Sequence, residues 1–216
     1  MREPETDLNV AMERYANGDE AAFRVLYPLL YPRFVSYFCR MVGRRDAAQV
    51  SDLVQETFLR VHRARSLFEK DASALAWVYT IARNVLTDQI RRQKVRTKYA
   101  GDLNAEPVDQ TANVESQVLA METARIVERA LASMPDAQRE AFVLVRYEGL
   151  SIKEAAQSLG ATETAVKLRA FRAYEILRNA LARAHAPGTI SSKKNLKPSA
   201  TSSVESTRAS SEPNKS

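Results

Sequence analysis

The side chains best suited to chemistry lie between residues 151 and 181, in the stretch SIKEAAQSLGATETAVKLRAFRAYEILRNAL. Lysine and arginine in its second half can neutralise phosphates, and arginine can also bind a guanine edge through two hydrogen bonds. Both functions suit a helix that contacts DNA. They require a fold that presents the basic side chains together on one face.

The spacing of three small or branched residues predicts that fold, a helix-turn-helix. Ala156 is small enough to let two helices approach closely, and Gly160 can take the positive φ angle that the turn requires. The β-branched Val166 follows early in the second helix, where it would hold the pair together. The second helix would then lie in a DNA major groove, with its N-terminal residues near the base edges.

Helical periodicity divides the second helix, from about residue 162, into two faces. One stripe, with Arg169 beside it, is expected to face the core and consists of Val166, Ala170, Ala173 and Leu177. The remaining surface carries Thr164, Lys167, Leu168, Phe171, Arg172, Glu175 and Arg178. A solvated basic face is the common alternative, but the helix-turn-helix spacing favours DNA.

A second basic cluster ends the helix that we predict over residues 73–93. Five of the eight residues from 91 to 98 are Lys or Arg, and Arg91 and Arg92 are among them. Upstream lie aromatic and polar groups that would suit unstacked bases and a phosphate backbone, namely Phe68, Trp77, Tyr79, Arg83 and Asn84. The alternatives are a solvated helix end, where the helix dipole favours cations, and a core position for Trp77.

The helix predicted over residues 47–64 has a charged face whose function the sequence pattern does not specify. It carries Asp52, Gln55, Glu56, Arg60 and Arg63, opposite an apolar side. Charged helix faces are usually only solvated, so the spacing alone indicates no partner. The sequence has no glycine-rich phosphate loop, no Ser/His/Asp set and no convincing carboxylate pair, which argues against an enzyme.

Helical periodicity runs through nearly the whole chain and predicts an all-α protein. An apolar stripe covers residues 23–42, where Pro28 and Pro32 are expected to kink or restart the helix. Further helices are predicted over residues 115–133 and 137–147, and no sheet is expected. We therefore predict an N-terminal helical domain over residues 1–99, an acidic linker over 100–114, a helix-turn-helix domain over 115–185, and a disordered tail over 186–216.

Composition limits the class of protein. The tail contributes +3 of the net charge of +6, through five Lys/Arg against two Asp/Glu, so the basic clusters elsewhere are local. The single Cys39 excludes an internal disulfide, and two scattered histidines give no His/Cys metal spacing. The sequence shows no apolar run of membrane-spanning length and no signal-peptide core, so a soluble cytoplasmic protein without cofactors is expected.

Taken together, three segments resemble a bacterial sigma factor of the extracytoplasmic-function group. They are DLVQETFLRVHRA at residues 52–64, ALAWVYTIARNVLTDQIRRQK at 74–94, and residues 131–181 with the helix-turn-helix. Residues 18–38 also fit the first helix of that group, and the resemblance covers roughly residues 10–184. It implies a promoter-specificity subunit of RNA polymerase, without catalytic activity, in which a linker joins two helical domains called region 2 and region 4.

The resemblance also assigns roles to the three clusters. Region 2 would bind the clamp helices of the polymerase β′ subunit through Asp52, Gln55, Glu56 and Arg60. It would recognise and melt the −10 element through Phe68, Trp77, Arg83, Asn84, Arg91 and Arg92. Region 4 would touch the β flap and read the −35 element through Thr164, Lys167, Leu168, Arg169, Phe171 and Arg172. An anti-sigma factor is an expected further partner, and a small-molecule substrate is not expected.

Two positions depart from the family pattern. Leu168 stands where many members carry a small polar residue, so apolar contact with a thymine methyl group or a sugar would replace a hydrogen bond. Tyr174 replaces a common arginine and removes one phosphate contact.

Two other functions remain open at this point. A free-standing helix-turn-helix regulator would bind a palindromic operator as a homodimer, and its N-terminal helices would serve for dimerisation or ligand binding. An adaptor that sequesters a regulator by mimicking a sigma factor would support no promoter-specific transcription. Binding to core polymerase, together with specific initiation, separates all three functions.

Overall fold

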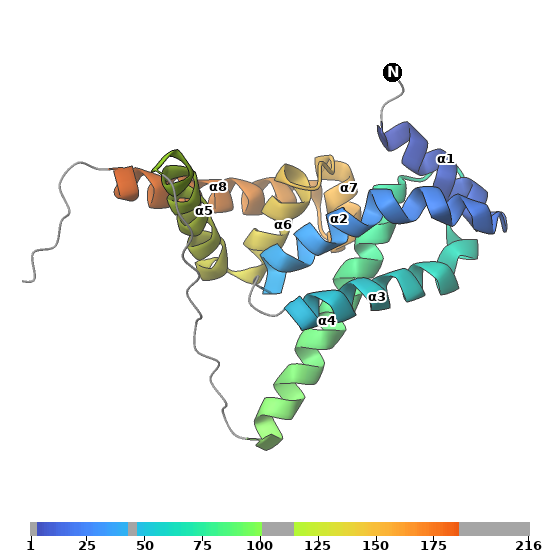
Figure 1. The fold of residues 1–216 in the computed structure, drawn as a ribbon, viewed down its shortest axis with the longest axis horizontal. Helices are drawn as coiled ribbons and strands as arrows, with labels where there is room; N and C mark the ends of the chain where they lie inside the picture. The colour runs from blue at the N-terminus through green and yellow to red at the C-terminus, as the bar shows by residue number, and fades with distance from the viewer. Residues whose placement is uncertain (1–3, 43–46, 101–114, 186–216) are drawn as a thin grey trace, which may run out of the picture. The chain divides into compact units, whose positions relative to one another are not determined.

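The computed structural model describes residues 4–42, 47–100 and 115–185, and every regular element in these ranges is helical (Figure 1). The all-α prediction is confirmed. Most of the predicted linker and all of the predicted tail lie outside the described residues. In chain order the helices are α1 (Pro4–Ala16), α2 (Phe23–Val42), α3 (Ala47–Ala64), α4 (Ala74–Ala100), α5 (Glu115–Ser133), α6 (Asp136–Arg146), α7 (Ile152–Leu159) and α8 (Glu163–His185), with short 3-10 turns at Glu20–Ala22 and Arg65–Leu67.

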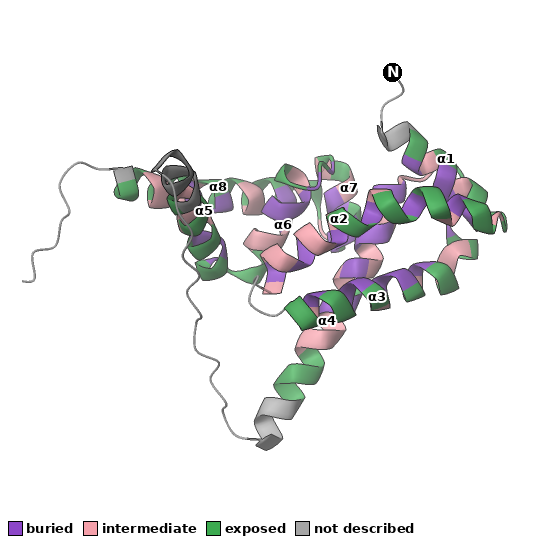
Figure 2. Ribbon diagram, in the orientation of Figure 1, coloured by how far each residue is buried: buried purple, intermediate pink, exposed green. Residues whose placement is uncertain are grey.

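One face of α2 forms the centre of the core, where it packs against α1 and α3 (Figure 2). The ring of Phe34 on α2 also meets that of Tyr79 on α4 edge-on, with 6.0 Å between the ring centroids. Steps of three and four residues place the buried side chains of α2 on one side of the helix. They are Leu26, Leu30, Phe34, Tyr37, Phe38 and Met41.

The helix does not restart at its two prolines, since α2 is continuous from Phe23 to Val42. Pro28 and Pro32 are four residues apart and both are exposed. Each proline frees the carbonyl group four residues before it, and on an exposed face water can bind that group. The packed opposite face then keeps the helix intact.

No helix is predicted over residues 4–16, yet α1 forms there and completes the core. Leu8, Met12 and Tyr15 are buried. On the same helix, Asn9 Oδ1 accepts a hydrogen bond of 2.9 Å from the backbone N–H of Ala74 at the start of α4. The apolar positions of α1 are too few for a clear periodic signal, and packing against the other helices stabilises it.

The helices after residue 115 build a smaller core and also pack on the N-terminal helices. The smaller core consists of Ala130, Leu131, Met134, Phe142, Ala173 and Leu177. In addition, α6 lies against α2 and α7 lies against α4, so the chain up to residue 185 forms one compact unit. The domain boundaries at the linker stay a prediction. None of the described helices is both long and apolar enough to cross a membrane.

Candidate nucleic-acid interface

The turn between α7 and α8 has the geometry that the helix-turn-helix spacing predicts. Ser151 and Glu154 cap the start of α7 reciprocally, through hydrogen bonds of 3.2 Å and 2.8 Å between side chain and backbone. Gly160 ends α7 with a φ angle of +57°, in the left-handed region where a Cβ atom would be strained. The Thr162 hydroxyl accepts a hydrogen bond of 3.2 Å from Ala165 N–H at the start of α8.

The inward face of α8 fixes which side chains point to solvent. Val166 and Ala173 are fully buried, Leu177 is nearly so, and Ala170 is half-buried beside them. This stripe packs against α5, α6 and α7, as the periodicity predicts. A rotation of α8 about its axis would expose these side chains to water, so packing holds the outward face in a defined direction.

The outward face of α8 carries the side chains that we predict to contact DNA. Thr164, Lys167 and Arg172 are exposed, and Arg169 is half-buried. Leu168 and Phe171 lie among them with 47% and 60% of their surface exposed. Within the described residues, no ion pair involves Lys167, Arg169 or Arg172, so these cations can bind phosphates or bases without breaking an internal bond.

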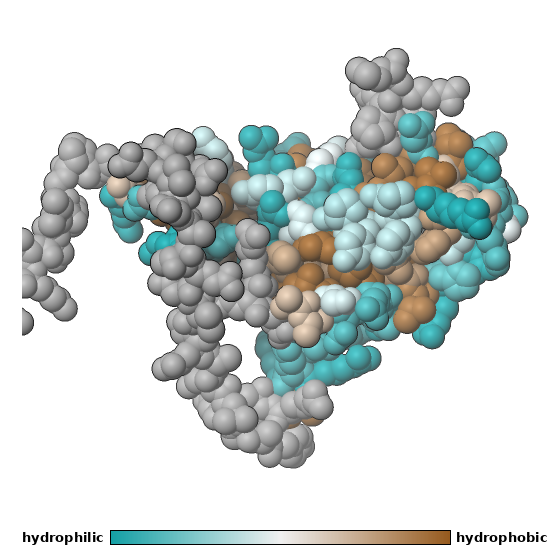
Figure 3. Space-filling view, in the orientation of Figure 1, coloured by the Kyte–Doolittle hydropathy of each residue, from teal (hydrophilic) through white to brown (hydrophobic). Residues whose placement is uncertain are grey.

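Some of the residues that we predict to contact the −10 element are exposed, and the others pack against or bind other parts of the chain. Asn84, Arg91 and Arg92 are exposed, and hydrophilic side chains cover this end of α4 in Figure 3. Trp77 is half-buried, and Phe68 is buried against it, with ring centroids 5.5 Å apart and the rings edge to face. The structure therefore places these two aromatic rings in the core rather than on an open platform.

Arg83 on α4 is held by a carboxylate from a distant part of the chain. Its Nε atom lies 3.2 Å from Glu140 Oε1 on α6, and about two-thirds of the Arg83 side chain is covered. Tyr37 on α2 donates a hydrogen bond of 3.2 Å to the same carboxylate. Burial raises the pKa of Glu140, although the charge and hydrogen bond of Arg83 and the hydroxyl of Tyr37 oppose this rise.

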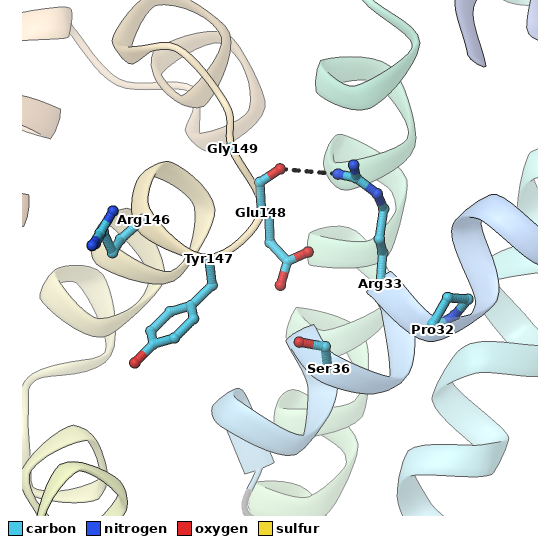
Figure 4. A pocket seen from close by; sticks show the side chains of 7 residues that line it. All are labelled: Pro32, Arg33, Ser36, Arg146, Tyr147, Glu148 and Gly149. Carbon is cyan, nitrogen blue, oxygen red and sulfur yellow. Dashed lines mark hydrogen bonds between the residues drawn. The ribbon is translucent and has the colours of Figure 1, made fainter. Parts of the chain in front are cut away.

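A second carboxylate, that of the buried Glu148, lies two residues after the end of α6 (Figure 4). Its Oε2 atom accepts a short hydrogen bond from the hydroxyl of Tyr79 on α4, and its backbone carbonyl accepts one of 3.1 Å from Arg33 on α2. Burial raises the pKa of Glu148, although hydrogen bonds from Tyr79 and Ser36 and the charges of Arg40 and Arg33 oppose the rise. No local sequence pattern marks Glu140 or Glu148 as a contact between distant helices, so neither contact was predicted.

The face of α3 that we predict to bind polymerase is largely open. Asp52 and Gln55 are exposed, whereas Glu56 and Arg60 are half-buried. The Arg60 guanidinium forms ion pairs with the carboxylates of Glu56 and of Asp88 on α4, each with a nitrogen–oxygen distance of 2.8 Å. Arg60 therefore also joins α3 to α4, and its hydrogen bond lowers the pKa of Asp88.

An aromatic cavity of about 630 Å³ adjoins this face, and the sequence patterns did not predict it. Tyr27 and Tyr31 stack along α2 with centroids 5.4 Å apart, and Tyr27 meets Phe58 of α3 at 4.9 Å. Both tyrosines and Leu59 leave more than two-fifths of their surface exposed. In Figure 3 hydrophobic side chains gather between α2 and α3. An exposed apolar surface of this kind is typical of a protein-binding site.

Comparison with known proteins identifies the two halves of the chain. Residues 26–96 match the model of Sigma-70 region 2, and residues 124–177 match that of Sigma-70, region 4. The ECF RNA polymerase sigma factor SigF of Caulobacter vibrioides is 37% identical over 184 residues, which are 85% of this chain and 99% of the relative. CarQ, an RNA polymerase sigma factor of Myxococcus xanthus, is 34% identical and covers 79% of this chain and 95% of its own length.

Solved structures give the same result. The sigma factor RpoE of Bartonella quintana, in complex with the anti-sigma factor NepR, superposes with a TM-score of 0.63 at 26% identity. The match covers 74% of this chain and 96% of that one. CnrH, in complex with the cytosolic domain of CnrY, has a TM-score of 0.61 at 26% identity and covers 83% of this chain and 99% of its own.

The chain thus belongs to the sigma-70 family and, within it, to the ECF RNA polymerase sigma factors. Sigma factors direct promoter-specific transcription, and they are transcription factors rather than enzymes. The resemblance stated from the sequence is confirmed.

The raised pKa values of Glu140 and Glu148 predict a pH-dependent stability. A carboxyl whose pKa is raised in the folded state contributes stability that is complete below the unfolded value of 4.5 and is lost as the pH rises through the folded value. The free energy of unfolding, measured with urea, should therefore fall as the pH rises above 4.5 and through the raised pKa values of these two carboxyls. Glu148→Gln should flatten this decline, because the amide has no proton to lose.

Asp19 and Asp88 set the lower limit of this pH window. Hydrogen bonds from Arg14 and Arg60 lower their pKa values, so their contributions are lost only as the pH falls below the usual aspartate value of 3.8. A free energy of unfolding that rises steadily as the pH increases from 4.5 toward neutrality, in wild type and Glu148→Gln alike, would contradict the assignment.

Proposed function

We propose that this sigma factor binds core RNA polymerase, reads the −35 element with α8, and recognises and melts the −10 element with α4. The observation that carries the proposal is the outward face of α8. A helix-turn-helix holds this face in one direction, and its cations are free of internal ion pairs among the described residues. Melting needs only binding energy, since captured single-stranded bases offset the loss of duplex stacking.

At the −35 element, the N-terminal half of α8 would enter the major groove. Lys167 and Arg172 supply the charge and the hydrogen-bond donors for phosphates and guanine edges. Leu168 and Phe171 are exposed between them and suit the methyl group of thymine. We therefore infer a mixed readout, in which apolar contacts complement the polar ones.

At the −10 element, Asn84 is the exposed polar group of α4 closest to the half-buried Trp77 along the chain, and Arg91 and Arg92 extend a basic track toward the end of the helix. We propose that Asn84 contacts a base and that the two arginines follow the backbone. In this arrangement Phe68 supports the ring of Trp77 from below rather than stacking on DNA itself.

Polymerase would bind the open face of α3 together with the aromatic cavity beside it. Asp52 and Gln55 offer polar contacts, and Tyr27 and Tyr31 offer apolar surface. The helix-turn-helix half would in addition touch the β flap. RpoE of Bartonella quintana was solved in complex with the anti-sigma factor NepR, and we propose a partner of that kind here. A subunit of RNA polymerase would act in the cytoplasm.

Lys167→Ala and Arg172→Ala test the groove-facing assignment. Each should weaken −35-dependent initiation by about 1–3 kcal/mol of binding free energy, because each removes a contact to a base edge or a phosphate. The measurement is in vitro transcription with core polymerase at several protein concentrations. Arg24→Ala on α2 removes one exposed positive charge elsewhere and serves as the control. If Lys167→Ala and Arg172→Ala transcribe as well as Arg24→Ala, the outward face of α8 does not read the promoter.

Asn84→Ala tests the melting assignment separately. It should impair open-complex formation, scored by permanganate reactivity of thymines in the −10 region, and should leave the affinity for core polymerase unchanged. Asn179→Ala, at an exposed position on α8, is the matched control. Wild-type permanganate reactivity in Asn84→Ala would remove this residue from the melting surface.

A further inference from the structure

The first helix, α1, binds the segment that joins α3 to α4, which covers residues 65–73 and is called the α3–α4 segment below. Glu13 Oε1 on α1 accepts a hydrogen bond of 3.3 Å from the backbone N–H of Asp71 in this segment. Asn9 Oδ1 accepts one of 2.9 Å from the N–H of Ala74, directly after it. Because Asn9 and Glu13 are four residues apart, they lie on the same side of α1.

The hydrogen bond to Asn9 satisfies a backbone group for which α4 has no acceptor. Ala74 begins α4, and the first N–H groups of a helix have no partner within it. Ser73 Oγ accepts a hydrogen bond of 3.2 Å from Ala76 N–H, and Asn9, 65 residues away, accepts the one from Ala74. Since Ala74 is buried, water cannot take the place of Asn9. The position of the first turn of α4, which includes Trp77, therefore depends on α1.

The hydrogen bond to Glu13 holds a turn whose backbone is strained. Asp71 has a φ angle of +62° and is the one non-glycine residue with a positive φ among those that the structure describes. A Cβ atom makes this left-handed conformation costly, and such a residue persists where the surrounding contacts hold it. The N–H of Ala72 closes the turn with a hydrogen bond of 3.2 Å to the carbonyl of Glu69, and Glu13 binds the turn from α1.

The α3–α4 segment carries side chains next to those that we propose to meet the −10 element. Phe68 is buried and meets the ring of Trp77 edge to face, with 5.5 Å between the centroids. Beside it in the chain, Leu67 has 74% of its surface exposed, and Lys70 is exposed as well. An exposed apolar side chain and a cation on an ordered backbone suit an unstacked base and its phosphate. Where these side chains lie depends on how α1 holds the segment.

We propose that Asn9 and Glu13 are positioning residues for promoter melting. They hold the α3–α4 segment and the start of α4 in the arrangement that single-stranded −10 DNA meets. A loop that is already held in its bound conformation loses less conformational entropy on binding, so more of the binding energy remains for separating the strands. The anchoring by α1 is a property of the free chain, whereas its effect on promoter DNA rests on the function proposed above.

Amide hydrogen exchange of the free, full-length protein tests the anchoring without polymerase or DNA. The double variant Asn9→Ala/Glu13→Ala removes both acceptors. It should speed the exchange of residues 68–76 about twofold to tenfold, the effect of losing an ordinary hydrogen bond, and leave α8 at its wild-type rates. The matched control is Asp7→Ala/Asn17→Ala, which removes a carboxylate and an amide from exposed positions on α1 and just after it. Unchanged exchange in the folded double variant, or equal acceleration in the control, would overturn the anchoring.

Conservative variants separate the two hydrogen bonds from the other contacts of these side chains. Asn9→Asp keeps an oxygen acceptor for Ala74 N–H, and its charge would lie at the N-terminus of α4, where the helix dipole favours it. Glu13→Gln likewise keeps an acceptor for Asp71 N–H. Both should exchange as wild type does, whereas Glu13→Ala alone, which breaks an exposed bond and leaves the core intact, should speed exchange at Asp71. Faster exchange in the conservative variants than in Glu13→Ala would contradict the anchoring.

Permanganate reactivity of thymines in the −10 region tests the effect on melting. Asn9→Ala/Glu13→Ala should form open complexes about twofold to tenfold less well, with unchanged affinity for core polymerase, and Asn9→Asp/Glu13→Gln should restore opening. A merely structural defect would lower core binding as well. Wild-type opening by Asn9→Ala/Glu13→Ala, with Asn84→Ala impaired, would overturn the positioning role and leave the function proposed above intact. A wild-type protein that binds core polymerase and melts no promoter would contradict both.

Discussion

The hydrogen bond between the Tyr79 hydroxyl and the buried Glu148 carboxylate joins α4 to the segment that follows α6. The placement of the helix-turn-helix against the N-terminal helices depends on this contact. Glu148 lies two residues after the end of α6, and its carbonyl group also accepts from Arg33 on α2. One residue thus connects α2, α4 and the entrance to the helix-turn-helix. Because the connection is made by a buried charged group and not by apolar packing alone, its strength depends on hydrogen bonds that a rearrangement can exchange.

The two surfaces that we propose to bind DNA differ in how far packing leaves them accessible. The outward face of α8 lies opposite the packed side chains of Val166, Ala173 and Leu177. On α4, the packing of α6 and α7 determines which side chains stay accessible. Asn84, Arg91 and Arg92 are exposed, whereas Arg83 is engaged.

The sequence predicts the local features well because they follow from helical periodicity and turn chemistry. The bounds of α3 and α5, the glycine at the end of α7 and the outward residues of α8 all come from short-range rules. The contacts of the half-buried Glu140 and the buried Glu148 could not be predicted, since Tyr37 lies 103 residues from Glu140 and Tyr79 lies 69 residues from Glu148. The continuity of α2 through Pro28 and Pro32 depends likewise on packing that no local pattern contains.

The most direct test of the central claim is transcription by core RNA polymerase on a pool of genomic promoters with the purified protein added. The account predicts that the protein binds core and starts transcripts from a limited set of promoters that share two elements at a fixed spacing. Failure to bind core polymerase, or binding without specific initiation, would contradict it. Binding of the protein alone, as a homodimer, to a palindromic site would point to a free-standing regulator instead.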